Sequence, residues 1–361
     1  AQFDIQQCAR LYRTVAQFES GRGNRPQPVC RKIVAAEQYA GDIWSQLRSD
    51  QTQQKIDPTA PTHRSDPKIG YIDCHRLDRR VAKAGGSGMI QPISSPDNQH
   101  IKSAAALRQK KHRDETGLFL LEGLHLVEAA VTAKWRIERA FVREDGLARN
   151  QFAELSEKLL ENGSQVFSVS SVLFNKITET DTPQGIVAVA RQCQPELSVN
   201  LLPAQAGDCL PWVVLDAIQD PGNAGTIVRN ADAAGVAGVI MTPGCADIYA
   251  GKTVRATMGS LFHVPTYRAS AQQCLDFFLA REIPIYIADA ASAESYVEID
   301  WRLPCAIVFG NEGAGVSELF RQKKVRAVAI PIVGKAESLN VASAAAVILY
   351  EAARQRGFSL S

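Results

Sequence analysis

Three polar side chains occupy unusual positions in residues 220–235, DPGNAGTIVRNADAAG, which follow the apolar run PWVVLDAI. Asn223, Arg229 and Asn230 lie near the start of an otherwise amphipathic helix, where a fold ordinarily places Leu or Val. Amide and guanidinium groups donate hydrogen bonds, and a guanidinium stays protonated at ordinary pH. The segment is therefore a candidate site for a polar or anionic ligand.

Two later segments repeat this arrangement of polar residues after an apolar run. NEGAGVSELF follows CAIVFG, and VGKAESLNVASAAAVILYEAAR follows VRAVAIPI. In open parallel sheets, ligands bind beyond the carboxyl ends of the strands. Each segment opens with Gly and polar side chains before a helix, so we expect free backbone N–H groups and small residues along one shared edge of a sheet.

Several familiar sites are excluded by the spacing of their motifs. GNEGAG has the order GxxGxG and follows a late strand, whereas a dinucleotide-binding turn has GxGxxG after the first strand. No GxxxxGK[ST] loop is present, so ATP-driven chemistry has no support. The six histidines and eight cysteines form no CxxC pair and no zinc-ligand spacing. We expect no metal site, and mostly buried, reduced thiols.

Composition indicates a globular protein with room for two domains, since 45% of its 361 residues are hydrophobic and 22% are charged. The formal net charge of +2 is too small to indicate a nucleic-acid partner by itself. No apolar run is long enough to span a membrane, and the N-terminal residues lack the apolar core of a signal peptide. We expect a cytoplasmic protein, or a plastid-type one if the first residues are an address sequence.

The chain divides into regions of different pattern. Residues 1–90 are rich in Gln, Arg, Asp and Pro and show no helical or strand period, so we expect an N-terminal extension with little structure, possessing at most a binding role. Met89 is a candidate alternative start. Residues 91–192 alternate helix and strand patterns, which predicts an α/β domain. A linker over residues 193–210 precedes a second α/β domain, residues 211–361, whose short apolar strands predict a parallel sheet.

The helix expected over DNQHIKSAAALRQKKHRDE, residues 97–115, concentrates basic side chains in a chain that is otherwise close to neutral. Two interpretations remain open for this run. It is either a solvated helix face, as most charge runs are, or a patch that contacts RNA phosphates. The candidate RNA-binding residues are Lys102, Arg108, Lys110, Lys111 and Arg113.

Together, the three polar segments resemble the three sequence motifs of the SpoU (TrmH) family of RNA 2′-O-ribose methyltransferases, part of the SPOUT superfamily. The motifs are DPGNAGTIVRNADAAG, IVFGNEGAGVS and IPIVGKAESLNVASAAAVILYEAA, in family order. Residues 91–192 are similar to the L30e-like substrate-binding domain of many members, notably in FLLEGLHLVEAA and TPQGIVAVA. The resemblance covers residues 91–361 and implies a deep trefoil knot in the C-terminal domain, a fold that topology rules alone disfavour.

The resemblance also implies a cofactor and site residues. S-adenosyl-L-methionine would contact Ala288, Gly310, Ile330 and Leu339, and no metal is needed. Arg229 corresponds to the family's catalytic arginine, supported by Asn223, Glu312, Ser338 and Asn340, each of which could instead be a helix cap or a turn residue. We expect Asn223 to precede the helix and to face the same edge as Arg229. Arg229 would bind an RNA phosphate and stabilise the developing alkoxide, although a role as base stays open.

The implied function is transfer of a methyl group to a ribose 2′-OH of structured RNA, with ribosomal RNA favoured by the L30e-like domain. The alternatives are a tRNA 2′-O-methyltransferase and a non-catalytic RNA-binding protein of ribosome assembly. Members of the family are homodimers through the knot region, so the same is implied for this chain. Because RNA recognition of this kind depends on shape and loop contacts, the target nucleotide has to be found by experiment.

Overall fold

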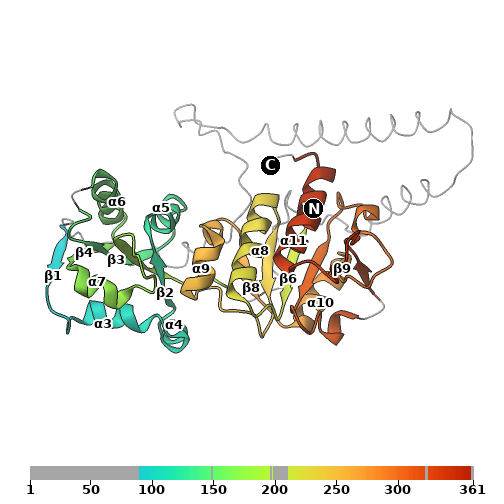
Figure 1. Cartoon of the computed structure of the whole chain (residues 1–361), viewed down its shortest axis with the longest axis horizontal. Coiled ribbons are helices and arrows are strands. Elements are labelled where there is room, and N and C mark those ends of the chain that lie inside the picture. Colours follow the sequence, from blue (N-terminus) through green and yellow to red (C-terminus); the bar gives the residue numbers. More distant parts are fainter. Residues whose placement is uncertain (1–88, 148, 196, 198–209, 322–323, 359–361) are drawn as a thin grey trace, which may run out of the picture. The chain divides into compact units, whose positions relative to one another are not determined.

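The computed structural model describes residues 89–147, 149–195, 197, 210–321 and 324–358 (Figure 1). The predicted N-terminal extension before residue 89 and most of the predicted linker lie outside the described residues. The described residues form two β-sheets, one from strands of residues 91–191 and one from strands of residues 212–328. Residues from both sheets, such as Phe119 and Val213, belong to one hydrophobic core.

The first sheet is mixed and is buried on both faces. Its strand order is β1-β4-β3-β5-β2, with β5 antiparallel to both β2 and β3. Side chains alternate between two cores along β2, so Phe119 and Leu121 enter one and Leu118 and Leu120 the other. The elements are β1 (Gln91–Ile93), α3 (Gln99–Ala106), α4 (Lys110–Thr116), β2 (Leu118–Glu122), α5 (Leu124–Thr132), β3 (Ile137–Arg143), α6 (Asn150–Glu161), β4 (Gln165–Val169), α7 (Ser171–Ile177) and β5 (Ile186–Arg191).

The single basic helix expected over residues 97–115 is wrong, because the chain forms two helices there. α3 ends at Ala106 and α4 begins at Lys110. Leu107 at the break is buried in the core of the first sheet. The Arg113 guanidinium turns back and donates hydrogen bonds to the carbonyl oxygens of Leu107 and Arg108, at 2.8 and 2.9 Å. These bonds satisfy carbonyl groups that a continuous helix would have used internally.

The second sheet is parallel throughout, as the apolar runs predicted. Its order is β11-β9-β10-β6-β7-β8. Val213 and Leu215 of β6 face the core that holds α8 and α11, whereas Trp212 and Val214 face the core that holds α10. The elements are β6 (Trp212–Asp216), α8 (Pro221–Ala234), β7 (Gly238–Met241), α9 (Gly251–Thr257), β8 (Thr266–Arg268), α10 (Ala271–Leu279), β9 (Ile285–Ala288), β10 (Ala306–Gly310), β11 (Val325–Val328) and α11 (Val341–Gln355).

The strand order places a topological switch point between β6 and β10. From β6 the chain adds β7 and then β8 on one side, and it later builds β9, β10 and β11 on the other. The segments that follow β6 and β10 therefore leave the same edge of the sheet in different directions, which opens a crevice at this point. Residues of the first and second polar segments meet there.

Helix α8 begins and ends as its sequence requires. The Asp220 side chain caps it by accepting from the Asn223 N–H, Pro221 occupies the first helical turn, and Gly235 ends it with a left-handed backbone, φ 65°. Gly225 lets α8 pack closely on α9, because a Cβ there would lie 2.6 Å from the Cβ of Ala256. Figure 1 shows α8 next to α11, which it contacts on another face.

Candidate active site

Three of the five expected catalytic residues form a chain of side-chain hydrogen bonds. The Asn340 amide donates to the Asn223 Oδ1 over 3.0 Å, and the Asn223 amide donates to Glu312 Oε1 over 2.9 Å. The second Glu312 oxygen lies 3.5 Å from the backbone N of Gln219. Each residue comes from a different polar segment, so the chain joins the loops that follow β6, β10 and β11.

The position expected for Asn223 is wrong, because this residue lies in the first turn of α8 rather than before it. Six helical residues rotate the chain by about 600°, so Asn223 and Arg229 point about 120° apart and do not share a face. Asn230, seven residues on, returns to within about 20° of Asn223. Its amide donates to the Ala342 carbonyl oxygen over 3.0 Å, so Asn223 and Asn230 both hold the start of α11 against α8.

Arg229 is exposed on α8 and is available to a ligand. Within the described part of the chain, no hydrogen bond or ion pair engages its guanidinium. Ser338 is also exposed, and no described residue hydrogen-bonds to its side chain. Among the described residues, neither side chain therefore hydrogen-bonds to the Asn340–Asn223–Glu312 chain. The expectation that Asn223 or Glu312 orients Arg229 has no hydrogen bond or ion pair to support it in the described part of the chain.

Several of the backbone N–H groups expected to be free along this edge are bonded to side-chain oxygens. Asp220 caps α8, and Asn340 caps α11 by accepting from the N–H groups of Ala342 and Ser343. In the turn after β10, the Asn311 side chain accepts from the N–H groups of Gly313 and Ala314. Since these donors are satisfied internally, binding of an anion at this edge depends on side chains such as Arg229 rather than on helix N-termini.

Sequence reasoning missed three residues that hold the loops in place. The buried Asp216 carboxylate at the end of β6 accepts from the Ser317 N–H over 2.6 Å and from the Thr242 hydroxyl over 3.1 Å. The Asn311 amide donates to the Ala217 carbonyl oxygen over 2.9 Å. A signal existed in the sequence, because Asp216, Thr242 and Asn311 each stand at or just after the end of an apolar run.

The four expected cofactor contacts lie at the same edge. Ala288 and Gly310 end β9 and β10, and Ile330 follows β11 by two residues. A side chain at position 310 is excluded, because a Cβ there would lie 2.4 Å from the backbone of Gly315 and Val316. Leu339 is 41% exposed. Among the described residues, none forms a backbone–backbone hydrogen bond with residues 330–339, so their polar groups remain available to a ligand.

The candidate RNA-binding residues fall into two groups. Lys102, Lys110 and Lys111 are exposed, and each pairs with an acid, Asp97, Asp114 and Glu115 respectively, at 2.8, 2.5 and 3.9 Å. Arg108 is exposed as well.

The prediction that Arg113 binds RNA is wrong, because only 4% of this residue is exposed and its guanidinium forms an ion pair with Asp247 at 2.7 Å. It holds α4 against the loop before α9 and is not available to RNA.

Among the described residues, no group of three or more His, Cys, Asp or Glu could hold a metal ion. Cys245, Cys274 and Cys305 are free, and burial raises the pKa of Cys245 to about 11. Cys193 is disulfide-bonded, contrary to the expected reduced state; it lies in the polar segment after β5 rather than in a core. None of the described helices is long and apolar enough to cross a membrane.

Comparison with known proteins places this site in a family. Residues 211–350 match the SpoU rRNA Methylase family, and residues 98–188 match the MRM3-like substrate binding domain. The chain is 37% identical to the 23S rRNA (guanosine(2553)-2′-O)-methyltransferase RlmP of Bacillus subtilis, over 72% of this chain and 98% of that protein. The SpoU match includes the first two polar segments and the third as far as residue 350.

Two solved structures share the fold. One is an AdoMet-bound rRNA methyltransferase from Sinorhizobium meliloti, with a TM-score of 0.66 and 34% identity over 74% of this chain and 98% of that chain. The other is the SpoU methyltransferase AviRb from Streptomyces viridochromogenes in complex with AdoMet, with a TM-score of 0.63 and 30% identity over 72% of this chain and 98% of that chain. The fold and the site thus define a methyltransferase of the α/β class with a parallel catalytic sheet. The chain belongs to the SpoU rRNA Methylase family.

Proposed function

We propose that this protein transfers a methyl group from S-adenosyl-L-methionine to a ribose 2′-OH of ribosomal RNA. The observation that carries the proposal is the Asn340–Asn223–Glu312 chain, which joins the three family motifs at the switch point. Arg229 on the same helix as Asn223 is exposed, and no described residue pairs with its guanidinium. When bound, the cofactor supplies an electrophilic methyl group. That methyl group would go to the 2′-oxygen, whose hydroxyl proton would leave to the neighbouring phosphate or to water.

Ala288, Gly310, Ile330 and Leu339 would hold the cofactor, through apolar contact and through backbone groups of residues 330–339. The close approach of Gly315 to Gly310 supports this assignment, because it lets the turn after β10 fold over the strand end. Of the polar residues, Arg229 would bind the phosphate beside the reacting ribose and stabilise charge that develops on the 2′-oxygen. Asn223, Glu312 and Asn340 are positioning residues that fix the three loops, and Ser338 would contact the ribose.

Ribosomal RNA is the substrate favoured by the relatives, since RlmP is named for 23S rRNA. The matched substrate-binding domain gives the chain a second surface for a folded RNA, to which Lys102, Arg108, Lys110 and Lys111 would contribute. Residues 193–210 would link the substrate-binding domain to the methyltransferase domain, and the two separate sheets support this division. A substrate of this kind is found where ribosomes are assembled, which agrees with the expected cytoplasmic location.

We also propose a trefoil knot in residues 211–361 and a homodimer formed through it. The exposed side chain of Tyr350 on α11, 47% accessible, is compatible with such an interface. Arg229 would then act on RNA held partly by the second subunit. Light scattering on the purified protein would test the dimer, and a single monomeric species would overturn it.

The experiment that tests the function is transfer of labelled methyl from S-adenosyl-L-methionine to rRNA and tRNA pools, by wild type and Arg229→Ala. Label recovered as a 2′-O-methyl nucleotide in rRNA, and lost in the variant, is the expected result. The variant should keep cofactor affinity within about twofold, because Arg229 is not among the residues proposed to hold the cofactor. Label in tRNA would reassign the substrate, and absence of label from both pools would contradict the enzyme assignment.

A further inference from the structure

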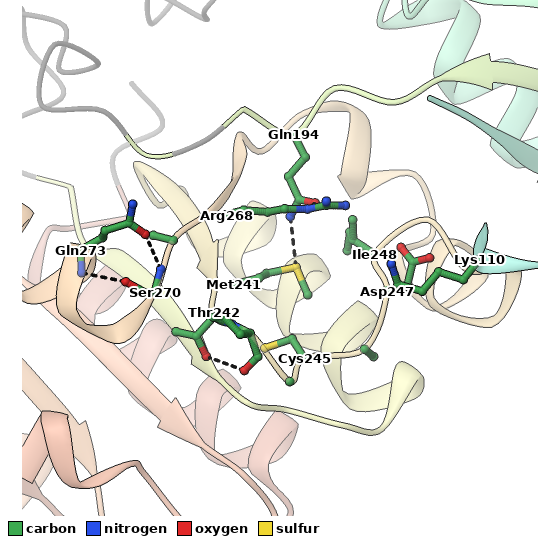
Figure 2. A pocket seen from close by; sticks show the side chains of 14 residues that line it. Lys110, Gln194, Met241, Thr242, Cys245, Asp247, Ile248, Arg268, Ser270 and Gln273 are labelled. Atoms are coloured by element: carbon green, nitrogen blue, oxygen red, sulfur yellow. Dashed lines mark hydrogen bonds between the residues drawn. The ribbon is translucent and has the colours of Figure 1, made fainter. Parts of the chain in front are cut away.

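A cavity of about 370 Å³ opens beside the proposed active site, at the carboxyl ends of β7 and β8 (Figure 2). Its size falls in the range of ligand pockets. None of the four proposed cofactor residues lines it, so it is distinct from the cofactor site. Its lining comes from the loop after β7, from β8, from the start of α10 and from two residues nearer the N-terminus. The polar side chains among them include Lys110, Gln194, Asp247, Arg268, Ser270 and Gln273.

Several free side-chain groups of this cavity are hydrogen-bond donors. The Gln194 oxygen accepts from Arg268 Nε over 2.7 Å, which leaves the Gln194 amide directed at the weak acceptor Met241 Sδ, 3.6 Å away. Ser270 and Gln273 use their side-chain oxygens to cap α10, which leaves the Ser270 hydroxyl proton and the Gln273 amide. No hydrogen bond from the described residues engages the terminal nitrogens of Arg268.

The one acidic side chain in the lining is already neutralised. Asp247 pairs with Arg113 at 2.7 Å through one carboxylate oxygen, and the other accepts from the Tyr249 N–H over 2.9 Å. Lys110 adds a positive charge, shared with Asp114 at 2.5 Å. Figure 2 shows Gln194 and Arg268 on one side of the cavity, with Lys110 and the Ser270–Gln273 pair at opposite ends. The cavity thus offers donors and positive charge to an acceptor-rich, anionic ligand.

The wall of the cavity is fixed to the proposed active site. The Ala246 N–H donates to the Ile218 carbonyl oxygen over 2.7 Å, and Thr242 Oγ1 accepts from the Ala217 N–H over 3.0 Å. Ala217 and Ile218 lead directly into the segment that carries Asn223, and the Ala217 carbonyl oxygen accepts from the Asn311 amide. A ligand in the cavity therefore lies one short, well-anchored loop away from the place where the reacting ribose is proposed to bind.

We propose that this cavity takes an unstacked nucleotide of the RNA substrate, close to the methylated one. The apolar wall of Met241, Ile248 and Ala269 would face the base, and Arg268 and Gln194 would bind its carbonyl or phosphate oxygens. Splayed-out bases held in such pockets are the usual basis of sequence recognition in RNA. The proposal rests on the proposed RNA methyltransferase function and adds to it a site that selects the sequence beside the target.

The test uses the full-length protein and a 23S rRNA transcript that carries no 2′-O-methyl group and contains 4-thiouridine for crosslinking. Arg268→Ala and Gln194→Leu should each raise the KM or Kd for the transcript by about tenfold, which is the typical loss for a hydrogen bond to a charged or unpaired group. The kcat and the cofactor affinity should stay within about twofold of wild type. The matched control is Arg302→Ala, an exposed arginine paired with Asp300 outside the cavity, which should behave as wild type. Wild type should also crosslink to the transcript within residues 241–248 or 268–273.

Unchanged RNA affinity in both variants, or crosslinks confined to other residues, would overturn the proposal. Titration with AMP, GMP, CMP and UMP tests whether the ligand of the cavity is a free nucleotide. If one of them binds the cavity and neither substitution changes RNA affinity, the cavity is not an RNA subsite. Affinity and crosslinking need no turnover. Failure of wild type to methylate RNA would therefore count against the proposed function, whereas these two measurements still decide the cavity.

Discussion

The amide of Asn340 donates a hydrogen bond to the side-chain oxygen of Asn223 across 3.0 Å, joining two residues 117 positions apart in the chain. Asn340 also caps α11, so one side chain both starts the last helix and holds it to the first motif. The cap interpretation of Asn340 is therefore confirmed, and its bond to Asn223 supports a part in the active site, which stays a prediction. The same amide of Asn223 that accepts from Asn340 donates to Glu312, which makes this chain sensitive to charge.

Asn223→Asp should lower kcat on the order of a hundredfold, because a second carboxylate against Glu312 creates a like-charge contact that costs several kcal/mol. Glu312→Gln alone should stay much closer to wild type, since a glutamine oxygen still accepts from Asn223. The double variant Asn223→Asp/Glu312→Gln should recover part of the loss, because the glutamine amide then donates to the aspartate. Single-turnover methyl transfer measures all three, and absence of rescue would show that Asn223 has another role.

Asp220→Ala should destabilise the protein by about 1 kcal/mol through loss of the α8 cap, whereas Asp220→Asn keeps a capping oxygen and should cost less. The Asn223 N–H, followed by Lys252, lowers the pKa of Asp220. A carboxyl with a lowered folded-state pKa stabilises the fold fully above its unfolded-state pKa, about 3.9, and loses that contribution as pH falls through the folded value. Urea unfolding should therefore show the advantage of wild type over Asp220→Asn shrinking below about pH 4, and a constant difference would contradict the assignment.

Arg113→Ala should cost about 3–5 kcal/mol, because it leaves the Asp247 carboxylate nearly buried without its partner. Lys111→Ala is the matched control, since its side chain is 78% exposed and its pair with Glu115 is long, so its effect should stay below about 1 kcal/mol. Thermal or urea unfolding distinguishes the two. If both variants lost the same small amount of unfolding free energy, Arg113 would again be a candidate surface residue for RNA binding.

Cys245 should resist alkylation by iodoacetamide in the native protein at pH 8, because burial raises its pKa to about 11 and keeps the unreactive thiol form. Cys274 should behave alike, since burial raises its pKa to about 12. Peptide-resolved mass spectrometry, with a urea-unfolded sample as the reactive control, measures both. Rapid native labelling of Cys245 would show that the loop after β7 opens.

The sequence was sufficient for the parallel sheet and for the meeting of the three motifs, because apolar runs identify buried strands and carboxyl ends of parallel strands share an edge. It was insufficient where tertiary contacts decide. The ion pair of Arg113 and Asp247 spans 134 residues, and local pattern contains no sign of it. The strand β8, three residues long, is too short to show an alternation, although it supplies Arg268 to the cavity.

The sequence pattern also gave a wrong expectation for the backbone N–H groups at the starts of α8 and α11. A glycine-rich start of a helix suggests open N–H groups, yet Asp220 and Asn340 occupy those donors themselves. Capping residues were visible in the sequence at both places, so the signal for this correction was present. The rotation between Asn223 and Arg229 depended on where α8 begins, and helix ends are the least certain part of any reading of sequence.

The pairing of Lys102, Lys110 and Lys111 with neighbouring acids has a consequence for how the protein meets a polyanion. Each RNA phosphate that a protein neutralises contributes about −0.7 to −0.9 to the slope of log affinity against log salt concentration. A lysine whose acidic partner stays nearby neutralises a phosphate only in part, so it releases few condensed cations from the RNA. The affinity for RNA should accordingly fall only slowly as the salt concentration rises. Discrimination among ribosomal sites would then be decided by fit at close range rather than by long-range attraction.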